Sequence, residues 1–202
     1  MRKYQKKLIN TENSSSKLLS VARELFYRNG ISETGVAEII ETSGVSRTVL
    51  YDNFGSKRSL VLSTIHREGV EWRQWFFSEI SLSAVTPIGK LQQVFAVLEN
   101  WFSQKDYFGC FFINSVAGNA KDDDDYRKLA AEHKQCLTKF LSDLAKDARI
   151  QDSKRFTDQL LIIIDGAIIC RMMNKSISLQ KESEELLKLM IASYTSEHSE
   201  AV

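Results

Sequence analysis

The stretch from residue 34 to residue 57 reads Thr-Gly-Val-Ala-Glu-Ile-Ile-Glu-Thr-Ser-Gly-Val-Ser-Arg-Thr-Val-Leu-Tyr-Asp-Asn-Phe-Gly-Ser-Lys. Its first part predicts a short helix, because Val36, Ile39 and Ile40 stand at i, i+3 and i+4 and share one face. That helix is expected to end before Gly44, since glycine adopts the left-handed conformation that closes a helix. Gly44 is therefore the predicted centre of a tight turn.

A second short helix is predicted directly after this turn. Ser46 has the side chain of an N-cap, so the helix is expected to run from Arg47 to about Asn53. Val45 and Leu50 point inward in this arrangement, against the first helix. The outer face is polar and consists of Arg47, Thr48, Asp52 and Asn53, with Tyr51 beside them. A short helix of this kind fits the major groove of DNA while its partner helix crosses the backbone.

The sequence from Gly44 to Lys57 resembles the turn, the recognition helix and the start of the following helix in the tetracycline-repressor (TetR) family. The resemblance covers roughly residues 16 to 62, and its other matching positions are Ala22, Leu25, Phe26, Gly30, Thr34 and Leu60. It implies an all-α fold in which an N-terminal three-helix helix-turn-helix domain precedes a helical domain for effector binding and dimerisation. It also implies a ligand-responsive regulator, a repressor that binds a palindromic operator in double-stranded DNA.

The resemblance assigns roles only to residues that match. Tyr51 and Lys57 occupy positions that contact phosphates, and Arg47, Thr48 and Val49 occupy positions that face bases. Arg47 is the best candidate for reading a base, because its guanidinium can pair bidentately with guanine N7 and O6. The predicted DNA-binding set is Thr34, Arg47, Thr48, Val49, Tyr51, Asn53 and Lys57.

Two positions depart from the family pattern. Asp52 stands where the family more often has an aromatic, histidine or basic residue, and it either reads cytosine N4 or points away from the DNA. Ala37 replaces a residue that often supplies a polar DNA contact, and Glu38 and Glu41 add negative charge to the same helix. These departures leave an alternative, a protein that senses small molecules and has a weakened DNA-binding head.

The charge is distributed unevenly along the 202 residues. The formal net charge is +1, but residues 1–60 contain ten basic and six acidic side chains, so this part carries +4 and the remainder −3. Such an asymmetry is expected when one end of a protein meets phosphate. We predict a DNA-binding domain over residues 1–60 and an effector-binding and dimerisation domain over residues 61–202. The basic residues before position 8 form either an arm that contacts DNA or a frayed terminus.

Almost the whole chain has helical periodicity, and nine Gly with one Pro supply few turn signals for strands. About nine helices are expected, over residues 16–29, 36–43, 47–53, 57–79, 86–102, 110–117, 124–148, 153–174 and 182–198. The helix that begins at Lys57 is expected to link the two domains mechanically. The chain shows no secretory signal, and the apolar run 160–173 is too short to span a membrane, so we expect a cytoplasmic protein without membrane partners.

The last two predicted helices favour a homodimer. The helix over 153–174 is apolar nearly all round and needs cover on two sides, although cover within one subunit is the alternative. Two such helix pairs would form a four-helix interface, and two recognition helices about 34 Å apart would read a palindrome. The predicted dimerisation residues are Leu160, Ile164, Gly166, Ile168, Leu187, Met190 and Tyr194.

Aromatic residues cluster between positions 72 and 112. They either line a cavity for a bulky apolar or aromatic effector, whose identity is unknown, or pack as core. The predicted ligand-binding set is Trp72, Phe76, Trp101, Phe108, Phe111 and Asn114, in which Asn114 supplies a polar anchor or caps a helix end.

The sequence contains none of the usual catalytic motifs, and we predict no enzymatic activity and no cofactor. The acidic run from Asp122 to Asp125 could bind a cation. It is more typical of a solvated loop that enters a helix, where the helix dipole favours acidic residues. His133 and Cys136 stand at i, i+3 on one predicted helix and could form a metal or redox site together with Cys110. Nothing in the sequence shows that Cys110 lies near them. No metal site is therefore predicted.

Overall fold

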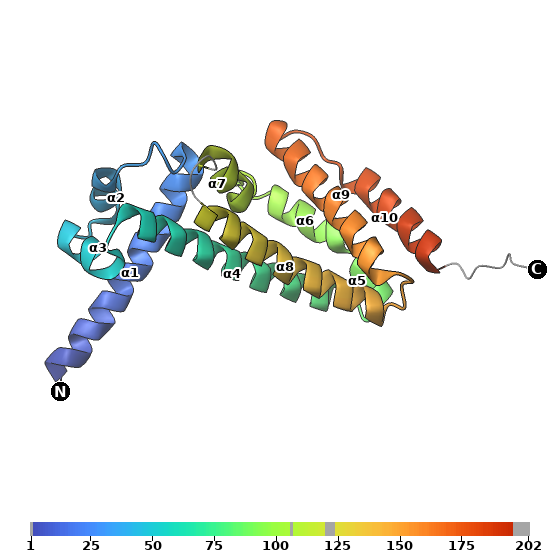
Figure 1. Ribbon diagram of the computed structural model, residues 1–202, viewed down its shortest axis with the longest axis horizontal. Coiled ribbons are helices and arrows are strands. Elements are labelled where there is room, and N and C mark those ends of the chain that lie inside the picture. The colour runs from blue at the N-terminus through green and yellow to red at the C-terminus, as the bar shows by residue number, and fades with distance from the viewer. Residues whose placement is uncertain (1, 106, 120–123, 196–202) are drawn as a thin grey trace, which may run out of the picture. The chain divides into compact units, whose positions relative to one another are not determined.

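The computed structural model describes residues 2–105, 107–119 and 124–195 and is all-α over these residues (Figure 1). The helices are α1 (Arg2–Asn29), α2 (Val36–Ser43), α3 (Arg47–Phe54), α4 (Lys57–Ser83), α5 (Pro87–Gln92), α6 (Val94–Phe102), α7 (Phe111–Asn119), α8 (Asp124–Asp147), α9 (Ser153–Met173) and α10 (Gln180–Thr195). The expected fold class is confirmed.

The helices differ from expectation in several places, among them the end of α4, which lies at Ser83 rather than near residue 79. Helix α1 begins at Arg2 rather than near residue 16, although the structure does not describe the side chains of residues 1–13. The helix expected over 86–102 is divided at Gln93, which lies between α5 and α6. Helix α10 begins at Gln180, two residues earlier than expected, and its expected end near residue 198 lies outside the described residues.

The chain divides into two compact units. The first contains Met1–Glu71 together with Cys110–Ala131, and the second contains Trp72–Gly109 together with Glu132–Val202. The unit that holds the predicted helix-turn-helix is therefore longer than residues 1–60 and discontinuous in sequence. The boundary at residue 60 stays a prediction about where DNA-binding ends.

The first unit has one apolar core that joins α1, α2, α3 and the first part of α4. Leu18, Ile39, Leu50, Leu60 and Ile65 are completely buried in it. The later segment contributes Phe111, Phe112 and Tyr126. Burial of a leucine or isoleucine side chain stabilises a fold by about 1.5–3 kcal/mol, so this core fixes the short helices α2 and α3, which would not be stable alone.

The second unit is built on aromatic and aliphatic packing. Phe77 on α4 stacks on Phe140 of α8, with ring centroids 4.1 Å apart, and Phe156 of α9 packs edge-on against Tyr194 of α10 at 5.5 Å. Helix α10 also packs against α5 and α6. Figure 1 shows α9 and α10 side by side at the end of the chain.

Candidate nucleic-acid interface

The turn between α2 and α3 has the geometry that the sequence predicts. Gly44 is left-handed, with φ 62° and ψ 17°, and its N–H donates to the carbonyls of Ile40 and Glu41. Ser43 is buried, and its Oγ accepts from the N–H of Val45 at 3.2 Å. Ser46 caps α3, because its Oγ accepts from the N–H of Val49 at 3.3 Å. The backbone N–H groups of Gly44, Val45 and Val49 therefore all find acceptors within the turn and its neighbouring residues.

Helix α3 separates an apolar inner side from a polar outer side. Leu50 is fully buried and Val45, just before the helix, is 8% exposed. The side chains of Arg47, Thr48, Tyr51 and Asp52 are all exposed. Asp52 lies in this exposed group, so its carboxylate is accessible to solvent on the outer side of α3.

Three other predicted DNA-binding residues are half-buried. Val49 packs against the core of the first unit. Asn53 donates from Nδ2 to the carbonyl of Val49 at 2.7 Å, so its amide is partly committed to the helix. Lys57 Nζ lies 3.4 Å from the carbonyl oxygen of Ser32, which is a long contact for a charged donor.

Thr34 differs from the expectation. Its side chain is completely buried, and its hydroxyl donates to the carbonyl of Gly30 at 2.7 Å, with the carbonyl of Leu25 at 3.3 Å. Its N–H also donates to Gly30. In this conformation Thr34 holds the end of α1 to the start of α2 and presents no polar group to a ligand.

A buried ion pair that the sequence did not indicate joins α1 to α4. Arg23 donates to both carboxylate oxygens of Glu68, and Tyr27 donates to Glu68 Oε1 at 3.2 Å. Glu68 is only 7% exposed. Burial, and then the negative charge of Glu68, raises the pKa of Tyr27, so its hydroxyl stays a donor. The residues are 41 and 45 positions apart, and no local pattern connects them.

Residues 18–64 match the model of the family described as bacterial regulatory proteins, tetR family. The regulator QacR of Staphylococcus aureus is 39% identical over 64 residues, which are 31% of this chain and 34% of that protein. A longer match, 21% identical over 184 residues, covers 89% of this chain and 93% of an HTH-type transcriptional regulator encoded in the lacX 3′ region of Lactococcus lactis. This chain covers only about a third of the length of QacR.

Solved structures confirm the fold over most of the chain. The regulator SCO4454 of Streptomyces coelicolor has a TM-score of 0.81 at 20% identity, with 92% of this chain and 97% of that chain covered. Reduced NemR of Escherichia coli has a TM-score of 0.79 at 17% identity, with 88% and 96% covered.

A capped recognition helix, a left-handed glycine turn and a supporting first helix define a helix-turn-helix transcriptional regulator. The N-terminal part of the chain, residues 18–64, belongs to the TetR family of DNA-binding transcriptional regulators.

Part of the predicted ligand-binding set meets in the second unit. The Trp72 ring stacks on Phe76 at 4.9 Å and meets Trp101 edge-on at 5.3 Å. Phe76 is fully buried and Trp101 is 9% exposed, so these rings are packed core in this conformation. The indole Nε1 of Trp72 is buried and has no acceptor among the described residues.

The other predicted ligand-binding residues, Phe108, Phe111 and Asn114, lie outside the cluster around Trp72. Lys175 Nζ lies over the Phe108 ring, 4.8 Å from its centroid. Phe111 and Asn114 belong to the first unit, where Phe111 packs against Tyr27 with centroids 4.5 Å apart. The N–H of Asn114 donates to the carbonyl of Cys110 as part of α7.

A buried histidine lies beside the Trp72 cluster. The His133 ring is 5.4 Å from the Trp72 ring, and Arg73 Nη1 donates to its Nδ1 at 3.2 Å. Burial, and then the charges of Arg73 and Lys134, lowers the pKa of His133 to about 3. The imidazole is therefore neutral at ordinary pH, with its proton on Nε2, because the guanidinium can only donate to Nδ1.

The predicted dimerisation residues divide into two groups. Leu160, Ile164, Ile168 and Leu187 are buried within the subunit. Tyr194 is half-buried and donates to Gln159 Oε1 at 2.9 Å, and Met190 is also half-buried. Gly166 is exposed.

Other apolar side chains of these two helices do reach the surface. They are Ile162, Ile169 and Met173 on α9 and Leu186 and Leu189 on α10. Together with Gly166 we call these residues the α9–α10 face. A helix that is apolar all round gives no sign of which side faces its own subunit.

Among the residues that the structure describes, no group of His, Cys, Asp or Glu is arranged to hold a metal ion. Asp125 instead pairs with Arg58 and Lys128, while Asp122 and Asp123 lie outside the described residues. Within the same part of the chain, no helix is long and apolar enough to cross a membrane.

Proposed function

We propose that the protein is a homodimeric repressor, acting in the cytoplasm, that binds a palindromic operator through α3 and is released by a small-molecule effector. The observation that carries this proposal is the exposed outer side of α3, where Arg47 and Thr48 stand free of the core that Leu50 anchors. A rigid helix with exposed donors at its N-terminal end matches the requirements of major-groove readout.

Different residues on this surface have different proposed roles. Arg47 reads a guanine, and Thr48 and Val49 contact neighbouring bases. Tyr51 and Lys57 bind phosphates, which position the helix without reading the sequence. The Asn53 amide already donates to the carbonyl of Val49, so Asn53 makes at most a secondary contact with DNA.

The α9–α10 face supports the dimer. Residues 162, 166, 169 and 173 follow one another at intervals of three and four, so they lie along one side of α9. Ile162 is 71% exposed and Met173 is 82% exposed. A Cβ added at Gly166 would meet no atom within 4 Å, which leaves room for a second helix to approach closely. We infer that a second copy covers this face, with α10 contributing Leu186 and Leu189.

The effector site is proposed at the cluster of Trp72, Phe76 and Trp101. A buried N–H without an acceptor costs about 1–3 kcal/mol, and an effector oxygen placed at Trp72 Nε1 would recover part of that energy. Trp72 lies on α4, which also begins with Lys57. A shift of this continuous helix would therefore change the spacing of the two recognition helices and weaken operator binding.

The alternative function is a small-molecule sensor with a weakened DNA-binding head. One observation favours it, because the Asp52 carboxylate is exposed on the same helix as Arg47, where it would repel phosphate. The sensor would bind ligand without binding DNA specifically.

Fluorescence anisotropy with the protein's own upstream region and with a scrambled duplex, at two salt concentrations, tests the proposal. We expect specific, salt-dependent binding. Arg47→Ala should relax preference at one base position and cost roughly 1–3 kcal/mol, whereas Lys57→Ala should weaken binding to all sequences and reduce the salt slope by about one. Arg155→Ala, at an exposed arginine on α9, is the control. Equal losses from Arg47→Ala on both duplexes would contradict the proposed base contact.

If the upstream region and the scrambled duplex bind equally, selection of sites from random DNA decides between the two functions. Enrichment of a palindrome supports the regulator. Failure to enrich any sequence, together with ligand binding, supports the sensor.

A further inference from the structure

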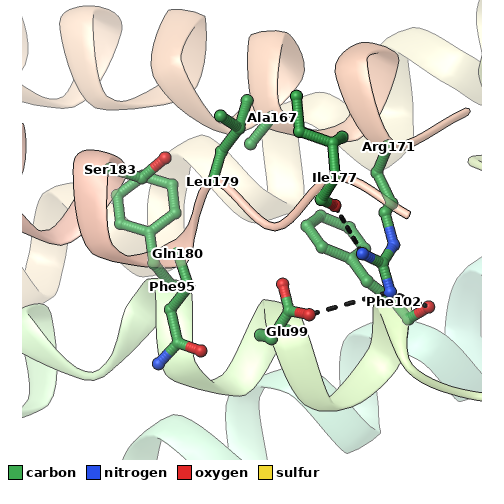
Figure 2. Close-up of a pocket in the computed structure, with 9 residues that line it drawn as sticks. All are labelled: Phe95, Glu99, Phe102, Ala167, Arg171, Ile177, Leu179, Gln180 and Ser183. Atoms are coloured by element: carbon green, nitrogen blue, oxygen red, sulfur yellow. Dashed lines mark hydrogen bonds and ion pairs between the residues drawn. The ribbon is translucent and has the colours of Figure 1, made fainter. Parts of the chain in front are cut away.

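A cleft in the second unit is separate from the Trp72 cluster and lies between α6, the end of α9, the connection to α10 and α10 itself (Figure 2). Its volume is about 260 Å³, part of which is open to solvent. That figure includes open solvent, and the enclosed part has room for about one water molecule, so a larger ligand enters only as the lining side chains move apart. We call it the Arg171 cleft.

Arg171 is the main polar group of the cleft. Its side chain is 14% exposed. Nη1 donates to the carbonyl of Ile177, and Nη2 donates to the carbonyl of Phe102 at 3.3 Å. The remaining guanidinium nitrogen, Nε, is buried and has no acceptor among the described residues. One N–H on this cation therefore lacks an acceptor, and an oxygen that enters the cleft reaches it when the lining side chains move apart.

Glu99 provides the opposite charge. Figure 2 shows its carboxylate pointing toward Arg171, and Oε1 lies 3.7 Å from Nη2. The same oxygen accepts from the Ser103 hydroxyl at 3.4 Å. Both contacts are long for hydrogen bonds to a carboxylate, which are usually about 2.7–2.9 Å with a cation, so Glu99 can accept a closer donor. The side chain is only 19% exposed, which strengthens its interaction with a ligand charge.

The remaining lining is suited to a short apolar group with some polar contact. Phe95, Ala167 and Leu179 provide apolar surface. Ser183 is 5% exposed, and Figure 2 shows its hydroxyl at the end of the cleft away from Arg171. These residues would surround the side chain of a ligand whose charged end lies at Arg171 and Glu99.

The charges of the cleft select the ligand class. A simple carboxylate would pair with Arg171 but would be repelled by Glu99, and a simple amine would meet the reverse arrangement. A molecule with both groups on one carbon satisfies the unpaired Nε–H and the under-used carboxylate together. We propose that the Arg171 cleft binds a free amino acid with a small aliphatic side chain, whose carboxylate accepts from Arg171 and whose ammonium donates to Glu99.

Three matched probes test this proposal by isothermal titration calorimetry on the full chain. L-valine carries both charged groups, isovalerate lacks the ammonium and isobutylamine lacks the carboxylate. We expect L-valine to bind at least tenfold more tightly than either fragment. The absence of L-valine binding, or equal binding of all three probes, would overturn the proposal.

Glu99→Gln separates a binding role from a structural one, because it preserves size and changes only charge. It should weaken L-valine binding roughly tenfold while strengthening isovalerate binding, since the repulsion is removed. The matched control is Glu132→Gln, the same change at an exposed position of α8. A Glu99→Gln variant that folds and leaves the order of the probes unchanged would refute the assignment of Glu99.

Arg171→Lys provides the second test if Glu99→Gln fails to fold. Lysine keeps the charge but loses the planar fork, so L-valine affinity should fall while the circular dichroism spectrum is retained. Undiminished affinity would overturn the role of Arg171. All these titrations are independent of DNA, so their failure would leave the proposed repressor function standing.

Discussion

Replacing Gly44 with alanine isolates the contribution of backbone conformation to the helix-turn-helix. Gly44 has φ 62°, and a Cβ added there meets only Lys17 Nζ, at an ordinary contact distance of 3.9 Å. No steric clash is introduced, so the cost comes from holding an L-residue in the left-handed region, which is about 1–2 kcal/mol. For a chain of this length, that lowers the Tm by roughly 2–8 °C.

Thermal and urea unfolding followed by circular dichroism measure this effect. Gly44→Asn should cost less than Gly44→Ala, because asparagine tolerates the left-handed region better. Gly118→Ala is the matched control within α7, where an added Cβ meets nothing within 4 Å and where the change should stabilise by about 0.5–1 kcal/mol. The reasoning is refuted if Gly44→Ala and Gly44→Asn are both as stable as the unchanged protein, or if both lose the same large amount.

Three further predictions concern a buried histidine, the dimer and the buried ion pair. The pKa of His133 is about 3 in the folded state and near 6.5 in the unfolded state, so the unfolded state takes up a proton first as the pH falls. The free energy of unfolding should therefore be highest well above pH 6.5 and should fall by about 2 kcal/mol on going to pH 5. Urea titrations should show that His133→Gln flattens this pH dependence. Ile169→Asp should convert the dimer to monomer in sedimentation velocity, whereas Leu82→Asp, an equally apolar surface site on α4, should not. An unchanged dimer would contradict use of the α9–α10 face. Glu68→Gln should cost about 1–3 kcal/mol of unfolding free energy, since Arg23 then lacks its charged partner, and a loss below 0.5 kcal/mol would argue against the ion pair.

The helix-turn-helix could be predicted from sequence because its determinants are local. Gly44, Ser46 and Leu50 each act on neighbours within a few positions, and the structure gives each the conformation or burial that was expected. The burial of Thr34 could not be predicted, because it depends on hydrogen bonds to the carbonyls of Leu25 and Gly30, which hydrophobic periodicity does not reveal.

Features that depend on distant parts of the chain could not be predicted. Gln93 interrupts the helix with φ −86° and ψ −4°, a conformation open to any residue, so neither glycine nor proline marks it. The exposed side of α9 could not be predicted for a related reason. Leu160 and Ile162 are similarly apolar, and only the packing of the second unit decides that the first is buried and the second is exposed.

The discontinuity of the first unit has a practical consequence for protein engineering. A fragment that stops at residue 60 would lose Ile65 and Glu68, which complete the core and the ion pair around α1. Extending it to Glu71 would still omit Phe111, whose ring covers Tyr27. Chimeras that exchange DNA-binding heads between regulators would therefore need to transfer the segment from Cys110 to Ala131 as well, or redesign the apolar surface that its absence would expose to water.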